Sequence, residues 1–315
     1  MTYPQKNDRW ELFYSASSVV KPCYSIVVPF YDDFESFKTL ISSICLQTFC
    51  NFEVVVVDDM SPNREIRFRK FLETWPEDFS LSIIFMSQKS NGSICRNVGC
   101  DLSKGDFIAF LDADDYWQSE KLEVMNNLIK NNQREAVFYH KYRLLIDDHF
   151  VQERPLEPIF EHQTYEDYSI VCSNHIQCST LVVPRSVMQN IRFDENLPRH
   201  QDLTFIIELR RAGYDFIFEN QSLSDYRYDS RKLQQKLRLG IITPQFFLNW
   251  RNQYLTPKTI AYNIYTLTVV ARAFQLKGQY IRCLEFCIKS IRMSSLPYMF
   301  RHISRFITSR RNSFN

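Results

Sequence analysis

Three aspartates within four residues, Asp112, Asp114 and Asp115, form the densest group of potentially catalytic side chains in the sequence. Carboxylates this close raise one another's pKa unless a cation neutralises them. Such oxygen-rich sites suit Mg²⁺ or Mn²⁺, which also bind the oxygens of a diphosphate and stabilise it as a leaving group. The alternative is that these acids cap a helix that begins near Ser119, although capping needs one acid and not three.

Two further acidic pairs, Asp32/Asp33 and Asp58/Asp59, also follow short apolar runs. These runs predict buried strands, and the segments between them have apolar residues at helical spacing. The expected strands are 24–29, 53–58, 81–86 and 106–111, and the expected helices are 34–47, 65–75, 94–102 and 119–129. This alternation predicts an α/β fold with a doubly wound, mostly parallel sheet flanked by helices. Ligands bind such sheets beyond the carboxyl ends of the strands, so the three acidic groups are expected at one edge.

The rest of the chain predicts a mixed region followed by a helical one. Strands are expected at 136–145, 179–184 and 216–218, with a helix over 203–212 that Gly213 ends. From about residue 230 the sequence becomes helical, basic and aromatic. We therefore predict a catalytic domain over 1–229, with a nucleotide-sugar half at about 22–117 and an acceptor half at about 118–229, and a helical C-terminal region over 230–315.

The charge of the chain is divided unevenly between these two regions. Residues 230–315 contain 15 Lys and Arg and a single acid, a net charge of +14, whereas 1–229 carry 23 basic and 35 acidic residues, a net charge of −12. The C-terminal sequence also contains an amphipathic stripe next to Arg301 and Arg305, made of Met299, Phe300, Ile303, Phe306 and Ile307. A basic amphipathic helix can lie in an anionic membrane surface, and the alternative is that the stripe packs on the catalytic domain.

Several classes of protein lack support in the sequence. The nine cysteines include no CxxC pair, which favours buried thiols in a reducing cytoplasm, and no apolar stretch is long enough for a signal peptide or a spanning helix. The six histidines show no zinc-ligand spacing, and GxSxG, P-loop and GxGxxG motifs are missing. No nucleic-acid-binding motif occurs, so a nucleic-acid partner is not expected.

Five segments in order resemble the GT-A fold, family 2 glycosyltransferases. They are SIVVPFY (25–31), QTFCNFE (47–53), VVDD (56–59), NGSICRN (91–97) and GDFIAFLDADD (105–115), and the resemblance extends over roughly 24–220. It implies an inverting hexosyltransferase that uses a nucleotide-diphosphate sugar, usually a UDP-sugar, together with Mn²⁺ or Mg²⁺.

The resemblance also implies roles for individual residues on the nucleotide side. Pro29 and Tyr31 match the loop that lies against the nucleotide. Asp58 and Asp59 match a pair of acids, one of which accepts a hydrogen bond from uracil. Arg96 matches an arginine that lines the nucleotide pocket; the alternative for it is a surface ion pair.

In the acid cluster, Asp112 matches the first acid of the DxD motif, near the ribose and the metal, and Asp114 matches the direct metal ligand. Asp115 either supports these acids or caps the next helix. Asp202 matches the catalytic base, for which the alternative is a helix N-cap. Gln201 stands where the family has Glu.

Three side chains, Gln201, His200 and Trp117, are further candidates for contacts with the acceptor or the phosphates. The expected reaction transfers a sugar to a hydroxyl of a growing glycan, linked to polyprenyl diphosphate or another lipid, in the synthesis of O-antigen, capsule or lipopolysaccharide. We expect a cytoplasmic protein held on the cytoplasmic face of the inner membrane by its C-terminal basic helices. The alternatives are an inactive nucleotide-sugar-binding module and a nucleotidyltransferase on a related fold.

Overall fold

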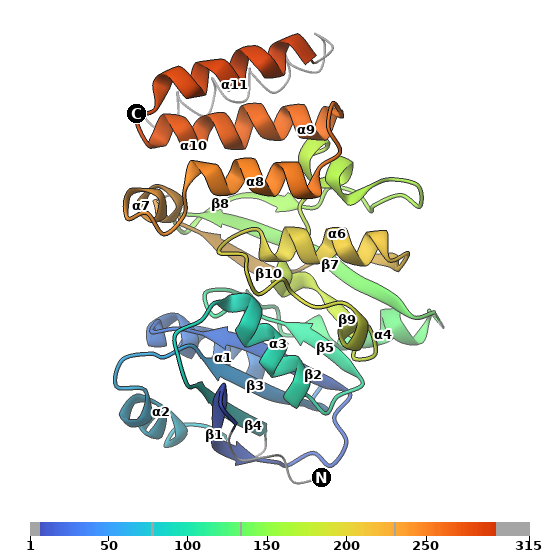
Figure 1. The fold of residues 1–315 in the computed structure, drawn as a ribbon. Helices are drawn as coiled ribbons and strands as arrows, with labels where there is room; N and C mark the ends of the chain where they lie inside the picture. The colour runs from blue at the N-terminus through green and yellow to red at the C-terminus, as the bar shows by residue number, and fades with distance from the viewer. Residues whose placement is uncertain (1–6, 77–78, 133, 230, 294–315) are drawn as a thin grey trace. The chain divides into compact units, whose positions relative to one another are not determined.

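The computed structural model describes residues 7–76, 79–132, 134–229 and 231–293 (Figure 1). The chain divides into two compact units. The sheet unit comprises Met1–Glu161 and Ile176–Tyr228, and the helical unit comprises His162–His175 and Asp229–Asn315. That residue 229 separates a catalytic domain from a C-terminal region remains a prediction. The segment 162–175, which we expect in the catalytic domain, belongs to the helical unit.

Within the described residues, the sheet unit contains one ten-stranded sheet in the order β1-β4-β3-β2-β5-β9-β7-β10-β6, with β8 paired to β7. The strands are β1 (Trp10–Ala16), β2 (Tyr24–Phe30), β3 (Phe52–Asp58), β4 (Ser80–Met86), β5 (Phe107–Phe110), β6 (Tyr116–Trp117), β7 (Ala136–Ile146), β8 (His149–Arg154), β9 (Val182–Pro184) and β10 (Asp215–Tyr228). Strands β2, β3, β4 and β5 are parallel to their neighbours in this group, as are β7 and β10. The predicted α/β architecture is confirmed.

Helices cover both faces of the parallel strands, which explains the run of four valines in β3. Val54 and Val56 pack on one face, in a cluster with α1 (Phe34–Cys45), α2 (Arg64–Leu72) and α4 (Lys121–Lys130). Val55 and Val57 pack on the other face with α3 (Gly92–Leu102). Because successive strand residues point to opposite faces, a strand covered on both sides is apolar throughout. Helices α5 (Val187–Asn190) and α6 (Gln201–Arg211) complete the unit.

Five strands differ from the expectation. The predicted strand over 179–184 is shortened to β9, because Cys178–Thr180 form a 3₁₀ turn in which the Gln177 side chain accepts a hydrogen bond from the Ser179 N–H. The predicted strand over 216–218 extends through Tyr228 after two register shifts. Strands β1, β6 and β8 were missed. Strand β1 is an antiparallel edge strand, half-exposed apart from Trp10 and the more exposed Ser15, so its apolar run is confined to Leu12, Phe13 and Tyr14.

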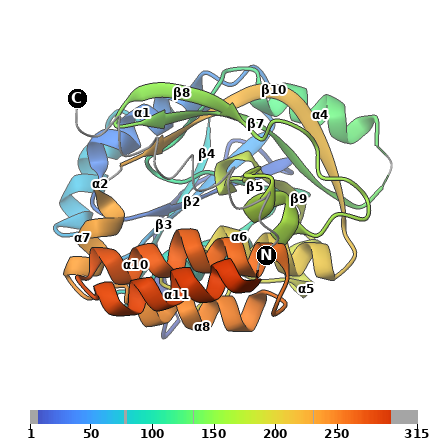
Figure 2. The same cartoon turned by 90° about the horizontal axis from the view of Figure 1, so that it is seen from above.

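The helical unit contains short helices around an aromatic core. They are η1 (Asp167–Val171), α7 (Lys232–Arg238), α8 (Pro244–Tyr254), α9 (Ile260–Tyr265), η3 (Thr266–Val270), α10 (Ala271–Leu276) and α11 (Tyr280–Met293). Helices α8, α10 and α11 lie side by side (Figure 2). The Trp250 ring lies 5.3 Å from that of Tyr254 and 5.0 Å from that of Tyr265.

No helix in the described part of the chain is long and apolar enough to cross a membrane. The amphipathic stripe predicted over 299–307 lies outside the described residues. Helix α11 precedes it and exposes its own apolar side chains, Ile281, Leu284 and Ile288, at a spacing of three and four residues. This spacing places them on one face of the helix.

Candidate active site

The predicted site residues lie at the carboxyl edge of the parallel strands. Tyr31 follows β2, Asp58 ends β3 and Asp59 follows it, and Asp112 and Asp114 follow β5. Because β2, β3 and β5 are parallel, their carboxyl ends lie at the same edge of the sheet.

Arg96 and Asp112 form the central contact of this edge. Arg96 projects from α3, is only 7% exposed, and forms an ion pair with the Asp112 carboxylate through Nη2. Its Nη1 donates to Oε1 of Gln201 at 3.1 Å. One guanidinium therefore joins α3, the loop after β5 and the first turn of α6. A surface ion pair does not describe Arg96, since the group is buried.

Burial and the neighbouring carboxylates both affect the pKa values of this ion pair. Burial raises the pKa of Asp112, Arg96 opposes that rise, and the charges of Asp114 and Asp202 add to it. Burial disfavours the charged form of Arg96, but Asp112 and Asp202 outweigh this and raise its pKa. Asp202 is thus close enough to act on both members of the ion pair. A cation bound beside these acids would favour their charged forms, as Arg96 does for Asp112.

Asp115 is a buried anchor and does not cap a helix. It is 1% exposed and accepts hydrogen bonds from Nε2 of Gln177 at 2.9 Å, Oγ of Ser179 at 2.7 Å and the N–H of Arg227 at 3.1 Å. Burial, together with the charges of Asp114 and Asp112, raises its pKa well above the ordinary value. Asp115 therefore ties the loop after β5 to β10 and to the turn before β9.

Asp112 and Asp114 fit a divalent cation that also binds a diphosphate. Asp114 is half-buried, beside Asp112. Among the described residues, no group of three or more His, Cys, Asp or Glu side chains could enclose a metal. Mg²⁺ is commonly held by one or two carboxylates with water and substrate phosphates. This donor set therefore suits a metal that arrives with its nucleotide.

Asp202 lies in the first turn of α6 but does not cap that helix. The cap position is His200, which has a φ of 62° and makes no side-chain cap hydrogen bond. Oδ1 of Asp202 accepts from the N–H of Leu203 at 2.8 Å, and the side chain is half-buried. The other first-turn residue, Gln201, binds Arg96 and donates Nε2 to the carbonyl oxygen of Leu197 at 2.8 Å. Of these two residues, it is therefore Gln201 that forms the hydrogen bond with Arg96.

On the nucleotide side, Asp58 and Asp59 have different environments. Asp58 is fully buried, accepts from the N–H of Ser61 at 3.1 Å and lies 3.5 Å from Nη1 of Arg64. Burial raises its pKa. The Asp59 carboxylate instead accepts from Nζ of Lys89 and from the N–H of Ser90, both at 2.6 Å. Asp58 organises the loop after β3, and Asp59 faces the connection between β4 and α3.

Three other candidates differ in exposure. Tyr31 is 49% exposed, as a residue that contacts a ligand can be, whereas Pro29 lies within β2 opposite Val57. Trp117 is 3% exposed, donates Nε1 to the carbonyl oxygen of Ser179 at 2.9 Å, and carries Nζ of Lys121 3.3 Å from its ring centroid. The structure therefore places Trp117 in the core, away from a position suited to an acceptor.

Sequence reasoning missed four side chains that hold the site: Lys89, Ser90, Gln177 and Ser179. Lys89 and Ser90 could have been found, because they follow β4 at the same edge as the acids. Gln177 and Ser179 lie more than sixty positions from Asp112, and nothing in their local pattern indicates that they reach it.

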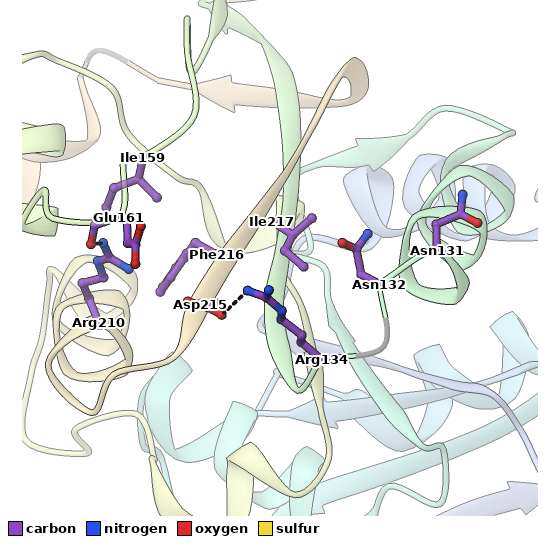
Figure 3. Close-up of a pocket in the computed structure, with 9 residues that line it drawn as sticks. All are labelled: Asn131, Asn132, Arg134, Ile159, Glu161, Arg210, Asp215, Phe216 and Ile217. Carbon is purple, nitrogen blue, oxygen red and sulfur yellow. Dashed lines mark hydrogen bonds and ion pairs between the residues drawn. The ribbon is translucent and has the colours of Figure 1, made fainter.

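A separate pocket of about 740 Å³ lies away from the acid cluster. Figure 3 shows its lining residues around the beginning of β10, including Phe216, Ile217 and Asp215. Strands β5 and β7 are both antiparallel to β9, so β7 runs in the same direction as β5, and β10 is parallel to β7. The beginnings of β7 and β10 therefore lie at the opposite edge of the sheet. Asp215 is paired there with Arg134 at 3.5 Å, and we do not assign the donor to this pocket.

Sequence comparisons place the chain among bacterial glycosyltransferases. Residues 25–144 match the model of glycosyl transferase family 2. The amylovoran biosynthesis glycosyltransferase AmsB of Erwinia amylovora is 31% identical over 249 residues, which cover 78% of this chain and 83% of AmsB. The UDP-Glc:alpha-D-GlcNAc-diphosphoundecaprenol beta-1,3-glucosyltransferase WfgD of Escherichia coli is 31% identical over 170 residues, 54% of this chain and 63% of WfgD.

A structural comparison supports the same fold. The mannosyltransferase PcManGT from Pyrobaculum calidifontis, solved in complex with GDP-Man and Mn²⁺, superposes with a TM-score of 0.56 and 14% sequence identity. The match covers 95% of this chain and 83% of PcManGT. The GT-A fold expected from the sequence is confirmed.

Ser179→Ala tests whether the turn before β9 holds the acid cluster. The Ser179 hydroxyl donates to Asp115 and accepts from the N–H of Asp112 at 2.9 Å, so its loss leaves two buried polar groups without that hydrogen bond. We expect the free energy of unfolding to fall by roughly 1–3 kcal/mol in urea denaturation. The exposed Ser186→Ala is the control and should change little. Equal stability of Ser179→Ala and the parent chain would contradict the role given to Ser179.

Proposed function

The chain belongs to glycosyltransferase family 2, and from this premise we propose that it transfers a sugar from UDP to a hydroxyl of a growing glycan. The observation that carries the proposal is the meeting of three elements at one sheet edge. Arg96 from α3 binds Asp112 after β5 and Gln201 in the first turn of α6, next to Asp202. Donor-binding acids and a candidate base are thereby brought to one place.

The donor is proposed to be a UDP-sugar. The nucleobase of this donor would lie against Pro29 and Tyr31 and form a hydrogen bond with Asp59. Asp58 would stabilise the loop after β3 by accepting a hydrogen bond from the N–H of Ser61. Uridine diphosphate is supported by the similarity to WfgD, whose name gives UDP-Glc as its donor. The buried guanidinium of Arg96 would attract the phosphates of the donor, whose ribose would lie near Asp112.

We propose that Asp114, with Asp112, holds Mn²⁺ or Mg²⁺ together with the donor diphosphate. When bound, a divalent ion there stabilises the negative charge of the leaving diphosphate. The support is the crowding of carboxylates at this edge and the Mn²⁺ in the PcManGT structure. Arg96 keeps Asp112 in place through its ion pair, and Asp115 keeps the loop in place through its three hydrogen bonds.

Asp202 is proposed as the catalytic base of an inverting transfer. The acceptor oxygen attacks the anomeric carbon as the bond from that carbon to the diphosphate oxygen breaks, and the hydroxyl proton passes to Asp202. The assignment is supported by the effect of Asp202, which lies on a different element, α6, on the pKa of both Asp112 and Arg96. A single displacement requires the base on the side of the sugar opposite the leaving diphosphate, and a residue on a separate element can take that position. His200 caps and Gln201 begins the helix α6 that carries Asp202, and Gln201 accepts a hydrogen bond from Arg96.

The acceptor is proposed to be a lipid-linked glycan of a surface polysaccharide, such as O-antigen, capsule or lipopolysaccharide. AmsB is named for amylovoran biosynthesis, and the name of WfgD gives a diphosphoundecaprenol acceptor. The helical unit would bring the enzyme to the cytoplasmic face of the inner membrane. The described part of that unit contributes the exposed face of α11, with Ile281 and Leu284, and the basic sequence beyond residue 293 would add attraction to anionic lipids.

A panel of UDP-sugars with Mn²⁺, incubated with the full chain, tests donor use. We expect slow release of UDP from one UDP-sugar without acceptor and faster release with a lipid-linked glycan. Asp114→Ala should lose this release together with its dependence on Mn²⁺, whereas Asp106→Ala, an exposed acid on the sheet unit, should retain both. The donor assignment fails if no UDP-sugar is turned over, and the metal assignment fails if Asp114→Ala still responds to Mn²⁺.

The substitution Asp202→Asn tests whether Asp202 is the catalytic base. Loss of a general base should slow transfer by roughly 10²–10⁴-fold, while UDP affinity measured by calorimetry stays the same. Asp215→Asn, at the opposite edge of the sheet, is the matched control and should transfer normally. If Asp202→Asn retained activity, another residue would have to accept the proton. If the parent chain bound UDP without transfer, it would be an inactive binding module.

Flotation with phosphatidylglycerol vesicles tests membrane attachment. We expect the full chain to float with anionic vesicles, less so at high salt, and not with neutral phosphatidylcholine vesicles. The double substitution Ile281→Asp and Leu284→Asp should weaken flotation. Ile66→Asp, at an exposed isoleucine of α2, should not. A chain that ignores anionic vesicles and acts only on soluble glycans would rule out the membrane proposal.

A further inference from the structure

Lys121 is a buried ammonium group behind the acid cluster, and no step of the proposed transfer uses it. It is the first residue of α4, and it is 0% exposed. Its Nζ donates to the carbonyl oxygen of Ser179 at 3.0 Å and lies 3.3 Å from the centroid of the Trp117 ring. No carboxylate of the described residues forms an ion pair with it, and Cys178 and His140, which interact with its charge, are not acids of that kind.

This position costs stability for two reasons. A charged ammonium is disfavoured in a buried place without a carboxylate, and burial lowers the pKa of Lys121 well below its ordinary value. The amino end of a helix also carries a partial positive charge, which disfavours a cation in the first turn. A methionine would fill a similar space without either cost. Residues that break such rules are expected where they serve a functional site.

The site that Lys121 serves is reached through Ser179. The carbonyl oxygen of Ser179 accepts from Nζ of Lys121 and from Nε1 of Trp117 at 2.9 Å, which fills its two acceptor positions. The hydroxyl of the same serine accepts from the N–H of Asp112 at 2.9 Å and donates to Oδ2 of Asp115 at 2.7 Å. Asp112 and Asp115 are the two ends of the acidic loop after β5. One serine therefore holds both ends of this loop, and Lys121 holds the serine.

We propose that Lys121 is a positioning residue for the transfer, which fixes the Ser179 peptide and thereby keeps the loop 112–115 in the form that accepts the metal and the donor diphosphate. The proposal rests on the assignment of a divalent ion and a nucleotide-diphosphate sugar to this edge of the sheet. Lys121 is fully buried, so it acts through Ser179 and does not contact the donor. Its cost in stability is offset by the precision that it gives to the loop.

Calorimetric titration of UDP into the full chain, with Mn²⁺ and with EDTA, tests the inference. Loss of a group that supports metal ligands commonly weakens metal binding 10- to 100-fold, so Lys121→Met should bind UDP roughly 10- to 100-fold more weakly than the parent in Mn²⁺. In EDTA its UDP affinity should equal that of the parent. Its free energy of unfolding in urea should stay the same or rise, because the buried charge is removed. Lys130→Met, at the exposed end of the same helix, is the matched control and should change none of these.

The double variant Lys121→Met/Ser179→Ala tests the route through Ser179. If Lys121 acts on the loop through the Ser179 hydroxyl, adding Lys121→Met to Ser179→Ala should weaken UDP binding in Mn²⁺ by a smaller factor than it does in the parent. Losses that multiply in full would show that the two residues act independently, and they would overturn the proposed role.

The outcomes separate this inference from the proposed function. If the parent does not bind UDP, or binds it equally with Mn²⁺ and with EDTA, the donor or the metal assignment is wrong and the role of Lys121 falls with it. If the parent shows the Mn²⁺ effect and Lys121→Met binds as the parent does, Lys121 does not position the loop, and the transferase assignment stands. Equal losses of affinity in Mn²⁺ and in EDTA, or a Lys121→Met chain that fails to fold, would make Lys121 an ordinary core residue and overturn the proposal.

Discussion

The buried ion pair between Arg96 and Asp112 is the interaction on which the rest of the site depends. The charges of Asp114 and Asp202 act on Asp112, and burial alone would favour the neutral forms of Asp112 and Asp115. One guanidinium allows part of this charge to persist without a ligand. A divalent cation with a diphosphate, as proposed for this edge, would be favoured by the same crowding of carboxylates.

The sheet supplies the rigidity that this crowding needs. The acids follow parallel strands whose two faces are covered by helices, so the strand ends cannot move apart without exposing a large apolar core. Asp115 adds a second restraint, because its hydrogen bonds join the loop after β5 to β10 and to the turn before β9. The acids at this edge are therefore held by the packed sheet and by a buried polar network.

The local sequence pattern predicted the features that depend only on neighbouring residues. The runs of β2, β3, β4 and β5 are apolar because both faces are covered, and their acids follow at once, so both strand and site could be found. Strand β1 is half-covered and β10 is interrupted by register shifts, so neither has a clear period. Asp115 could equally have been a cap, since only its contacts with Gln177, Ser179 and Arg227 show otherwise. Contacts between distant segments leave no signal in a single sequence.

The glutamine at position 201, where the family has Glu, has a physical explanation in this structure. Its Oε1 accepts from Arg96, and its Nε2 donates to the carbonyl oxygen of Leu197 at 2.8 Å. A carboxylate could perform the first role but not the second, because it would set an oxygen against an oxygen. It would also add another negative charge near Asp112 and would divide Arg96 between two acids. The amide fixes the first turn of α6, and with it Asp202, while leaving the charge of Arg96 to Asp112.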